Sequence, residues 1–113
     1  MHEMSIMTSL LEAVEQEAER VGARKVVGIN LVIGERMSVI DDSLLFCFDL
    51  LTPGTVAEGA QIHIRRTQMR FHCDIDGPYT RTGEDFRCPR CQTVGRLTDE
   101  GSELLVESIE VEQ

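Results

Sequence analysis

Aromatic residues are scarce in this sequence, which has four Phe, one Tyr and no Trp among its 113 residues. The core must therefore be built mainly from Leu, Ile, Val and Met, which gives a modest and adaptable core. Apolar residues make up 42% and charged residues 27% of the chain, which is ordinary for a folded protein and excludes wholesale disorder. A chain of this length has room for one domain with a small appendage.

Long apolar runs and positive charge are also lacking. No run approaches the roughly 20 residues that cross a bilayer. The first helix-like segment carries Glu3, Glu12, Glu15, Glu17 and Glu19 where a signal peptide needs positive charge. A formal net charge of −9 disfavours nucleic acid and membrane surfaces as partners. We therefore expect a cytoplasmic protein whose cysteines stay reduced, which favours metal binding over disulfides.

The spacing of apolar residues predicts two helices and three strands. Met4 to Val21 and Ser43 to Leu51 have the three-and-four spacing of amphipathic helices. Val26 to Ile33, Ile62 to Phe71 and Leu104 to Val111 are rich in β-branched residues or alternate as strands do. The expected fold is α+β, with two helices packed on a three-stranded sheet.

The segment from His72 to Thr98 interrupts this pattern. It has little periodic apolar content but three of the four cysteines, so we expect it to lack a core of its own and to need a metal staple. The predicted organisation is thus one α+β domain formed by residues 1–71 and 99–113, with a small zinc knuckle at residues 72–98 inserted before the last strand.

Cysteines in the insert have the spacing of a zinc site. Cys88 and Cys91 form a C-x2-C turn, which lets two thiolates converge on one tetrahedral Zn²⁺. A redox C-x-x-C motif is the alternative, but such a motif opens a helix and no helical periodicity follows here. Cys73 lies where a second cysteine pair would begin. Cys47 lies among apolar residues of the second helix, and we expect it to be a buried core residue.

The fourth zinc ligand is less clearly specified. Asp76 stands at the spacing where a second upstream cysteine is expected, and a carboxylate oxygen can bind Zn²⁺, so Cys73, Asp76, Cys88 and Cys91 form a permissible set. Asp76 could equally be a turn residue before Gly77. The competing ligands are His72, Asp74 and His63. Because adjacent residues of an extended chain point to opposite faces, ligation by both His72 and Cys73 is awkward.

Basic residues are concentrated around the insert. Seven of the eleven basic residues lie between Gln61 and Arg96: Arg65, Arg66, Arg70, Arg81, Arg87, Arg90 and Arg96. A nucleic-acid-binding patch would explain them, but few aromatic residues accompany them, and arginines also offset the charge of a thiolate-rich site. We favour the second explanation.

The start of the sequence offers a second metal site. In Met1-His2-Glu3, the terminal amine, the His2 amide nitrogen and the His2 ring can form fused chelates that suit Ni²⁺ or Cu²⁺. A histidine near a chain end can also be an ordinary surface residue. The helix predicted to follow would hold such a chelate in one place.

Together, these residues resemble the HypA/HybF family of hydrogenase maturation proteins. The resemblance extends along the whole chain and is carried by these features: Met1-His2-Glu3 with Ser5, Gly34-Glu35-Arg36, Asp41 to Leu44, Gly59 to Ile64, and Cys88-Pro-x-Cys91. It implies a nickel metallochaperone rather than an enzyme, which delivers Ni(II) to the large subunit of [NiFe] hydrogenase.

The same resemblance implies particular ligands and partners. Nickel would be bound by the N-terminal residues, with His2 as the essential ligand, the Met1 amine beside it, and Glu3 and Asp41 nearby. Zinc would be structural, and a maturation GTPase of the HypB type would be a partner. An Asp before a helix is also a common N-cap, which is the other interpretation of Asp41.

The sequence departs from the family pattern at Asp76, where cysteine is usual. We therefore expect a weaker and more acid-labile zinc site, or recruitment of His72. Two other functions fit less well. A zinc-ribbon adaptor or nucleic-acid-binding module is disfavoured by the net charge. A zinc enzyme using three cysteines and a water lacks the H-x-E pair of the zinc deaminases.

Overall fold

The computed structural model describes residues 3–113, which form two compact units. The first holds the described residues up to Val32, together with Ser38–Arg65 and Leu105–Gln113, and the second holds Ile33–Met37 and Arg66–Leu104. The elements, in chain order, are α1 Glu3–Arg20, β1 Lys25–Gly34, α2 Asp41–Leu51, β2 Gln61–Thr67, β3 Phe71–Cys73, β4 Gly77–Tyr79, β5 Arg96–Leu97 and β6 Leu104–Glu112.

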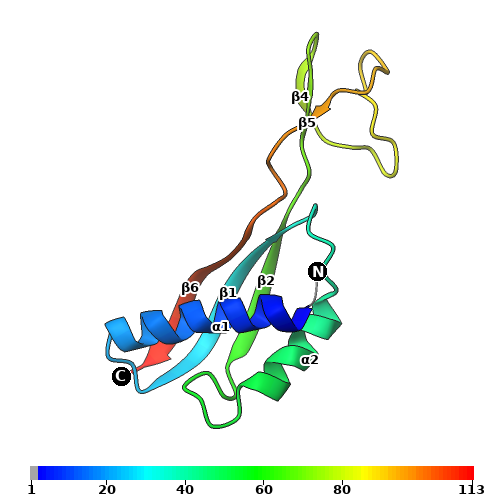
Figure 1. Cartoon of the computed structure of the whole chain (residues 1–113). Coiled ribbons are helices and arrows are strands. Elements are labelled where there is room, and N and C mark those ends of the chain that lie inside the picture. Colours follow the sequence, from blue (N-terminus) through cyan, green and yellow to red (C-terminus); the bar gives the residue numbers. More distant parts are fainter. Residues whose placement is uncertain (1–2) are drawn as a thin grey trace. The chain divides into compact units, whose positions relative to one another are not determined.

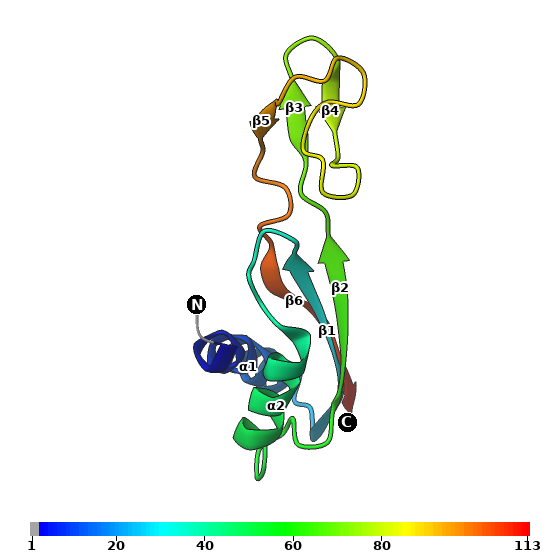
Figure 2. The same cartoon turned by 90° about the vertical axis from the view of Figure 1, so that its right-hand side faces the viewer.

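The first unit is the α+β layer expected from the sequence. Its sheet has the strand order β2-β1-β6, so the central strand β1 is flanked by a strand from the far end of the chain. Both helices cover the same face of this sheet (Figures 1 and 2). Within this layer the core joins the apolar side of α1 to β1 and α2; its fully buried side chains include Met7, Val14, Ile29, Leu31 and Leu44.

The first helix ends where its sequence predicts. Gly22 adopts a positive φ of 65°, a conformation that costs little only for glycine. The Gly22 N–H donates to the Glu19 carbonyl at 3.1 Å, and the Ala23 N–H donates to the Ala18 carbonyl at 2.9 Å. These two bonds form a Schellman motif, which satisfies carbonyls that the helix end would otherwise leave unpaired.

The second helix begins two residues earlier than predicted. Ile40 is its N-cap residue, so Asp41 lies inside the first helical turn. The interpretation of Asp41 as an N-cap is therefore wrong. An acidic residue in the first turn still interacts favourably with the positive end of the helix dipole.

The predicted strand from Ile62 to Phe71 is divided in two. β2 ends at Thr67, and β3 begins at Phe71 in the second unit. Between them, the Met69 N–H donates to the side chain of Glu35 at 3.1 Å, so this donor bonds a carboxylate in place of a neighbouring strand. Alternation in the sequence does not reveal this break, because it depends on a residue more than thirty positions away.

The second unit contains a small sheet of order β4-β3-β5. Phe71 pairs with Tyr79 across β3 and β4, and their rings stack with centroids 5.3 Å apart. Together with Cys73 and Cys88 they form a buried cluster. The expectation that this segment has no core of its own is therefore wrong: it has a small one, and two of its four members are cysteines.

No helix among residues 3–113 is both long enough and apolar enough to cross a lipid bilayer.

Candidate metal centre

Four side chains of the second unit converge on one point: Cys73, Asp76, Cys88 and Cys91. Their potential ligand atoms all lie within 4.8 Å of one another. The sulfurs of Cys73 and Cys91 are 3.5 Å apart, and Asp76 Oδ2 lies 3.3 Å from the Cys88 sulfur and 3.8 Å from the Cys73 sulfur. All four cysteines of the chain are free thiols.

These separations fit a tetrahedral zinc ion. Zinc–sulfur bonds of about 2.3 Å at tetrahedral angles place two sulfurs roughly 3.8 Å apart, and a sulfur and a carboxylate oxygen roughly 3.5 Å apart. The three observed distances scatter around these values. The cluster could therefore hold zinc through three sulfurs and one oxygen without rearrangement of the backbone.

Two tight turns bring the ligands together. Cys73 is the last residue of β3, and the turn that follows leads into β4 at Gly77. The φ of 85° at this position favours glycine. On the other side, the Cys88 N–H donates to the Thr93 carbonyl, and the Gln92 N–H donates to the Cys88 carbonyl. Gln92 is the one non-glycine residue with positive φ among residues 3–113, and it directly follows Cys91.

Hydrogen bonds within the cluster favour the ionised forms of Cys73 and Asp76, whereas the pKa of the Cys91 thiol is raised, because its contacts with Cys73 and Asp76 and its burial outweigh the hydrogen bonds from Thr93. The backbone N–H groups of Asp76 and Ile75 lower the pKa of the Cys73 thiol. The thiols of Cys88 and Cys91 lower the pKa of the Asp76 carboxyl. A thiol with a lowered pKa releases its proton to a binding cation at less cost, so the contacts of Cys73 favour metal binding at neutral pH.

The competing fourth ligands lie outside the cluster. His72 pairs with Pro78 and Arg96 in the sheet, between the buried residues Phe71 and Cys73, and is not among the converging side chains. Asp74 is exposed and forms an ion pair with Arg96 at 3.5 Å. His63 is exposed on β2 in the first unit. Cys47 is buried in α2, as its apolar neighbours suggested.

Of the residues expected at the nickel site, Met1 and His2 lie outside the described residues. Glu3 is the first residue of α1 and is half-buried, and Asp41 is the first residue of α2. The Ile40 N–H donates to Glu3 Oε2 at 3.4 Å, which links the beginnings of the two helices. Glu3 and Asp41 are therefore held in the same part of the first unit.

A hollow opens beside Glu3. It has a volume of about 450 Å³ and is lined by Glu3, Met4, Asp42, Ser43, Phe46 and Cys47. Sequence reasoning placed Phe46 among the apolar neighbours of Cys47, but the structure leaves 64% of Phe46 exposed. Helical spacing agrees with this exposure, because Phe46 is two positions from the buried Leu44 and Phe48 and therefore lies roughly 200° around the helix from each.

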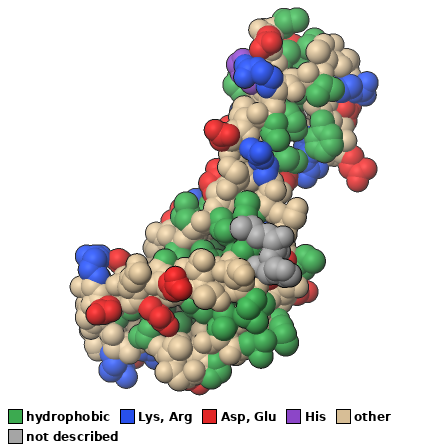
Figure 3. All heavy atoms as spheres, in the orientation of Figure 1, with side chains coloured by type: hydrophobic (Ala, Val, Ile, Leu, Met, Phe, Trp, Pro, Cys, Tyr) green, Lys and Arg blue, Asp and Glu red, His purple; other side chains and the backbone are tan. Residues whose placement is uncertain are grey.

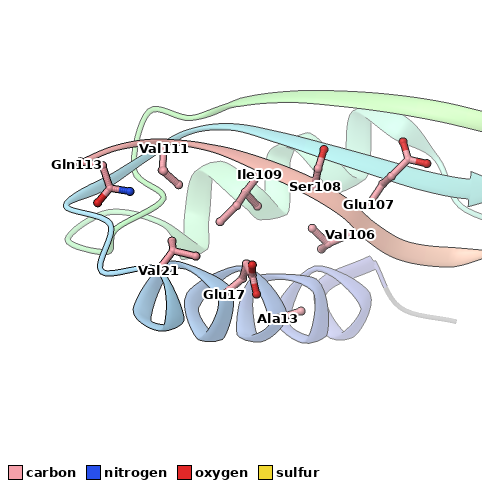
Figure 4. A pocket seen from close by; sticks show the side chains of 9 residues that line it. All are labelled: Ala13, Glu17, Val21, Val106, Glu107, Ser108, Ile109, Val111 and Gln113. Carbon is pink, nitrogen blue, oxygen red and sulfur yellow. The ribbon is translucent and has the colours of Figure 1, made fainter.

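A second cavity of the first unit lies elsewhere. It is a groove of about 660 Å³ between α1 and β6, with Val21, Val106, Ile109 and Val111 among its lining residues (Figure 4). Its lining includes neither histidine nor cysteine, and Glu17 is already bonded to Arg20. The groove therefore lacks the ligand types of a transition-metal site.

The arginines near the insert mostly form ion pairs. Five of the seven pair with carboxylates: Arg65 with Glu107, Arg70 with Glu100, Arg81 with Glu35, Arg87 with Asp85, and Arg96 with Asp74. Arg90 contributes to the lowered pKa of Asp76 through its charge. Charges neutralised in this way do not form a free basic surface for phosphates.

The Gly34-Glu35-Arg36 run has a structural role that sequence reasoning missed. Glu35 accepts two hydrogen bonds from Arg81, at 3.3 and 2.7 Å. Arg36 donates to the Thr98 carbonyl at 2.8 Å, and its backbone N–H donates to the Gly101 carbonyl at 2.7 Å. These bonds connect the run to Arg81, Thr98 and Gly101, so the run holds together separate segments of the second unit.

Comparison with known proteins gives a consistent result. Residues 1–111 match the family described as hydrogenase/urease nickel incorporation, metallochaperone, hypA. The hydrogenase maturation factor HypA of Dehalococcoides mccartyi is 41% identical over 113 residues, covering 99% of this chain and 95% of that protein. The protein of the same name from Escherichia coli is 36% identical over 117 residues and covers 100% of this chain and 99% of its own.

Solved structures with the same fold are also known. The solution structure of the Ni metallochaperone HypA from Helicobacter pylori superposes with a TM-score of 0.69 at 23% identity, covering 99% of this chain and 98% of that one. A second structure, described as the solution structure of HypA protein, gives a TM-score of 0.70 at 24% identity and covers 97% and 95% of the two chains. At this identity the likeness establishes the fold.

Proposed function

We propose that this chain, which belongs to the HypA family of hydrogenase maturation nickel metallochaperones, delivers Ni(II) to the large subunit of [NiFe] hydrogenase. The observation that carries the proposal is the family match from residue 1 to residue 111, which includes the Met1-His2-Glu3 opening. The family comprises maturation factors rather than catalysts, and we propose that this member too acts without catalysis, in the cytoplasm.

Nickel in this proposal is cargo, bound by nitrogen ligands at the start of the chain. The Met1 amine, the His2 amide and the His2 ring supply fused chelate rings, and nitrogen donors suit Ni²⁺. Glu3 and Asp41 are the nearby carboxylates. The link between Glu3 and the Ile40 N–H supports this assignment, because it ties the residue that follows His2 to the residue that precedes Asp41.

Zinc would have a different task in the second unit. Cys73, Asp76, Cys88 and Cys91 would hold it as a structural ion, in agreement with the donor distances of the cluster. Such an ion would join the β3–β4 turn to the Cys88–Cys91 turn. A structural zinc should remain bound while nickel is loaded and released, so the two metals would have separate sites.

Delivery requires partners. We propose a maturation GTPase of the HypB type as a partner in nickel transfer and the hydrogenase large subunit as the recipient. A carrier in such a sequence must bind nickel exchangeably, because a ligand set that never released the ion could not deliver it.

The nickel site is tested by calorimetric titration of the untagged protein with Ni²⁺. We expect stoichiometric binding to disappear in His2→Ala, which removes the ring nitrogen, and in a form with one glycine added before Met1, which displaces the amine. Asp41→Ala should have a milder effect, since water can replace a carboxylate. His63→Ala is the matched control, because His63 is an exposed histidine on β2 that is not among the proposed ligands.

Zinc content and circular dichroism should be the same in all these forms. Equal nickel affinity in the wild type, His2→Ala and the glycine-extended form would show that nickel is not bound at the amino terminus. Nickel content of hydrogenase purified from cells carrying His2→Ala in place of the wild type then tests delivery. An unchanged content would refute the carrier function.

A further inference from the structure

The segment that carries Cys88 and Cys91 is held by little hydrophobic burial. We call residues 86–95 the cysteine loop, and Cys88 is the one buried residue in it. Phe86 is 45% exposed and Val94 is 65% exposed. Figure 3 shows hydrophobic side chains at the surface of the second unit, in the part that carries β4 and β5 in Figure 1. Because burial contributes little to the order of this loop, other contacts must hold it.

The hydroxyl group of Tyr79 joins the two ends of the cysteine loop. It donates a hydrogen bond to the Phe86 carbonyl at 2.8 Å and accepts one from the Gly95 N–H, also at 2.8 Å. A phenol can donate and accept at the same time, so both bonds are compatible with one hydroxyl. Phe86 and Gly95 are the first and last residues of the loop. One side chain of β4 therefore closes the loop from outside it.

Tyr79 is itself held in place. Its side chain is 5% exposed, and its ring stacks on that of Phe71 with centroids 5.3 Å apart and planes at 17°. The same two residues are partners across β3 and β4. A packed aromatic side chain has only two torsions to fix, so holding it in one position costs little conformational entropy. Tyr79 therefore offers the ends of the loop a fixed anchor.

Gly95 allows the chain to come close to this anchor. A Cβ atom at this position would lie 2.5 Å from the His72 carbonyl oxygen and 2.9 Å from Cε1 of Tyr79. Any residue with a side chain would push the end of the loop away from β3 and from the phenol. The residue type at position 95 thus suits the hydrogen bond that its N–H donates to Tyr79.

Hydrogen bonds inside the loop place the two cysteines. The Cys88 N–H donates to the Thr93 carbonyl at 2.9 Å, and the Gln92 N–H donates to the Cys88 carbonyl at 2.8 Å. Arg87 pairs with Val94 in an isolated β-bridge. All of these contacts lie between the two ends that the phenol joins. Closing a loop at its ends restricts the conformations open to it, which favours the bonds inside it.

We infer that Tyr79 is a positioning residue of the metal site, whose hydroxyl holds the cysteine loop in the binding conformation before the metal arrives. Tyr79 supplies no ligand and acts through Cys88 and Cys91. A site whose ligands are already in place loses less conformational freedom when the ion binds, so it binds the ion more tightly. The inference rests on the proposed zinc site and is independent of the nickel site.

The test compares two variants that each lose one hydroxyl group from the second unit. Tyr79→Phe keeps the stacked ring but removes both hydrogen bonds to the cysteine loop. Thr98→Val is the matched control, because the Thr98 hydroxyl also donates to a carbonyl, that of Arg70 at 2.9 Å, and accepts from a backbone N–H, that of Glu100 at 3.3 Å. Thr98 belongs to the second unit but lies outside the cysteine loop.

Zinc affinity is measured on the full-length, metal-free protein by competition with a chromophoric chelator. We expect the Kd of Tyr79→Phe for Zn²⁺ to rise roughly tenfold, because one hydrogen bond is equivalent to a factor of roughly two to ten in an equilibrium constant. Thr98→Val should bind zinc as tightly as the wild type does. Both variants should still bind one zinc per chain at saturation.

Amide hydrogen exchange gives a second readout, which a purely structural role would not produce. In metal-free Tyr79→Phe, the amides of Cys88 and Gln92 should exchange faster than in the wild type, because their bonds lie inside the loop that has lost its closure. Added zinc should restore their protection, since the metal then closes the loop. In Thr98→Val both amides should keep the protection of the wild type.

Two results would overturn the inference alone. One is equal zinc affinity in the wild type and Tyr79→Phe. The other is an equal loss of affinity in Tyr79→Phe and Thr98→Val, because the phenol would then only stabilise the unit as a whole. If Cys88→Ser binds zinc as tightly as the wild type does, the proposed zinc site itself fails, and the inference fails with it. The expected loss in Tyr79→Phe would uphold the positioning role whether or not nickel binding depends on His2.

Discussion

Replacing Asp76 by cysteine would give the cluster of the second unit a fourth thiolate, and we expect it to bind zinc more tightly. Asp76 already lies in contact with its neighbours, with Oδ2 at 3.3 Å from the Cys88 sulfur and 3.8 Å from the Cys73 sulfur. A cysteine at this position would start from the same backbone, whose N–H donates to the Cys73 sulfur at 3.5 Å. The change therefore alters the ligand type more than the shape of the site.

The size of the effect follows from the energy per ligand. Structural zinc sites bind with roughly 10–16 kcal/mol at neutral pH, or about 3 kcal/mol for each of four ligands. A carboxylate retains part of this energy, so its exchange for a softer thiolate should gain about 1.5–3 kcal/mol. That gain corresponds to a zinc affinity roughly ten to a hundred times higher at pH 7.5.

The gain should depend on pH. Zinc displaces a proton from each thiol that it binds, whereas the Asp76 carboxyl is already ionised at neutral pH, and the thiols of Cys88 and Cys91 lower its pKa further below the ordinary value of 3.8. Below the pKa of the added thiol, the advantage of Asp76→Cys should shrink by about tenfold per pH unit. At about tenfold per pH unit, a hundredfold gain in zinc affinity at pH 7.5 would disappear about two pH units lower, near pH 5.5.

Competition with a chromophoric chelator, at pH 7.5 and again at lower pH, measures both quantities. Asp74→Cys is the matched control: it adds a thiol two residues away, but the Asp74 side chain is 82% exposed and points out of the cluster, so its zinc affinity should stay at the wild-type value. An unchanged affinity in Asp76→Cys, together with a large loss in His72→Ala, would refute the reasoning and make His72 the fourth ligand.

Three further predictions concern the second unit. Cys88→Ser should abolish zinc binding and speed amide exchange in β3 to β5 while α1 and the first sheet stay protected, because Cys88 is fully buried; zinc retained with an ordered unit would contradict this. Glu35→Gln should cost about 1 kcal/mol at pH 7, measured by thermal unfolding. Arg81 and the Met69 N–H lower the pKa of Glu35, so this contribution is present above its ordinary value of 4.5 and is lost as the pH falls through the lowered pKa; a difference that grows in acid would refute it. Gly34→Ala should destabilise the unit by roughly 2–4 kcal/mol, since the new Cβ would lie 1.9 Å from the Gly101 carbonyl oxygen, and an unchanged Tm would contradict this packing.

The first unit was largely predictable because its periodicities are strong and local. The apolar side of α1, the buried strand β1 and the end of α1 at Gly22 all follow from positions near one another in the sequence. The sequence alone also specified the α+β class. What it did not specify was the start of α2, where Ile40 and not Asp41 is the N-cap residue.

The second unit was harder to predict because its structure depends on long-range contacts. Glu35 forms hydrogen bonds with Met69 and Arg81, and these contacts end β2 and anchor the strands beyond it. No periodic pattern encodes such a contact. The metal-ligand spacing, by contrast, was informative: the cysteines and Asp76 that it selected converge in the structure, and His72 does not join them.

Burial within the cluster distinguishes Asp76 from two of the cysteines around it. Cys73 and Cys88 are 3% and 0% exposed and belong to the core that contains the stacked rings of Phe71 and Tyr79, so each serves packing in addition to its proposed role as a ligand. Asp76 is only half-buried and lies outside that core. A polar ligand at Cys73 or Cys88 would place a carboxylate among apolar side chains, which costs several kcal/mol unless a metal is always bound. At position 76 the same carboxylate keeps contact with water and with the charge of Arg90, so it is not a charge isolated among apolar side chains.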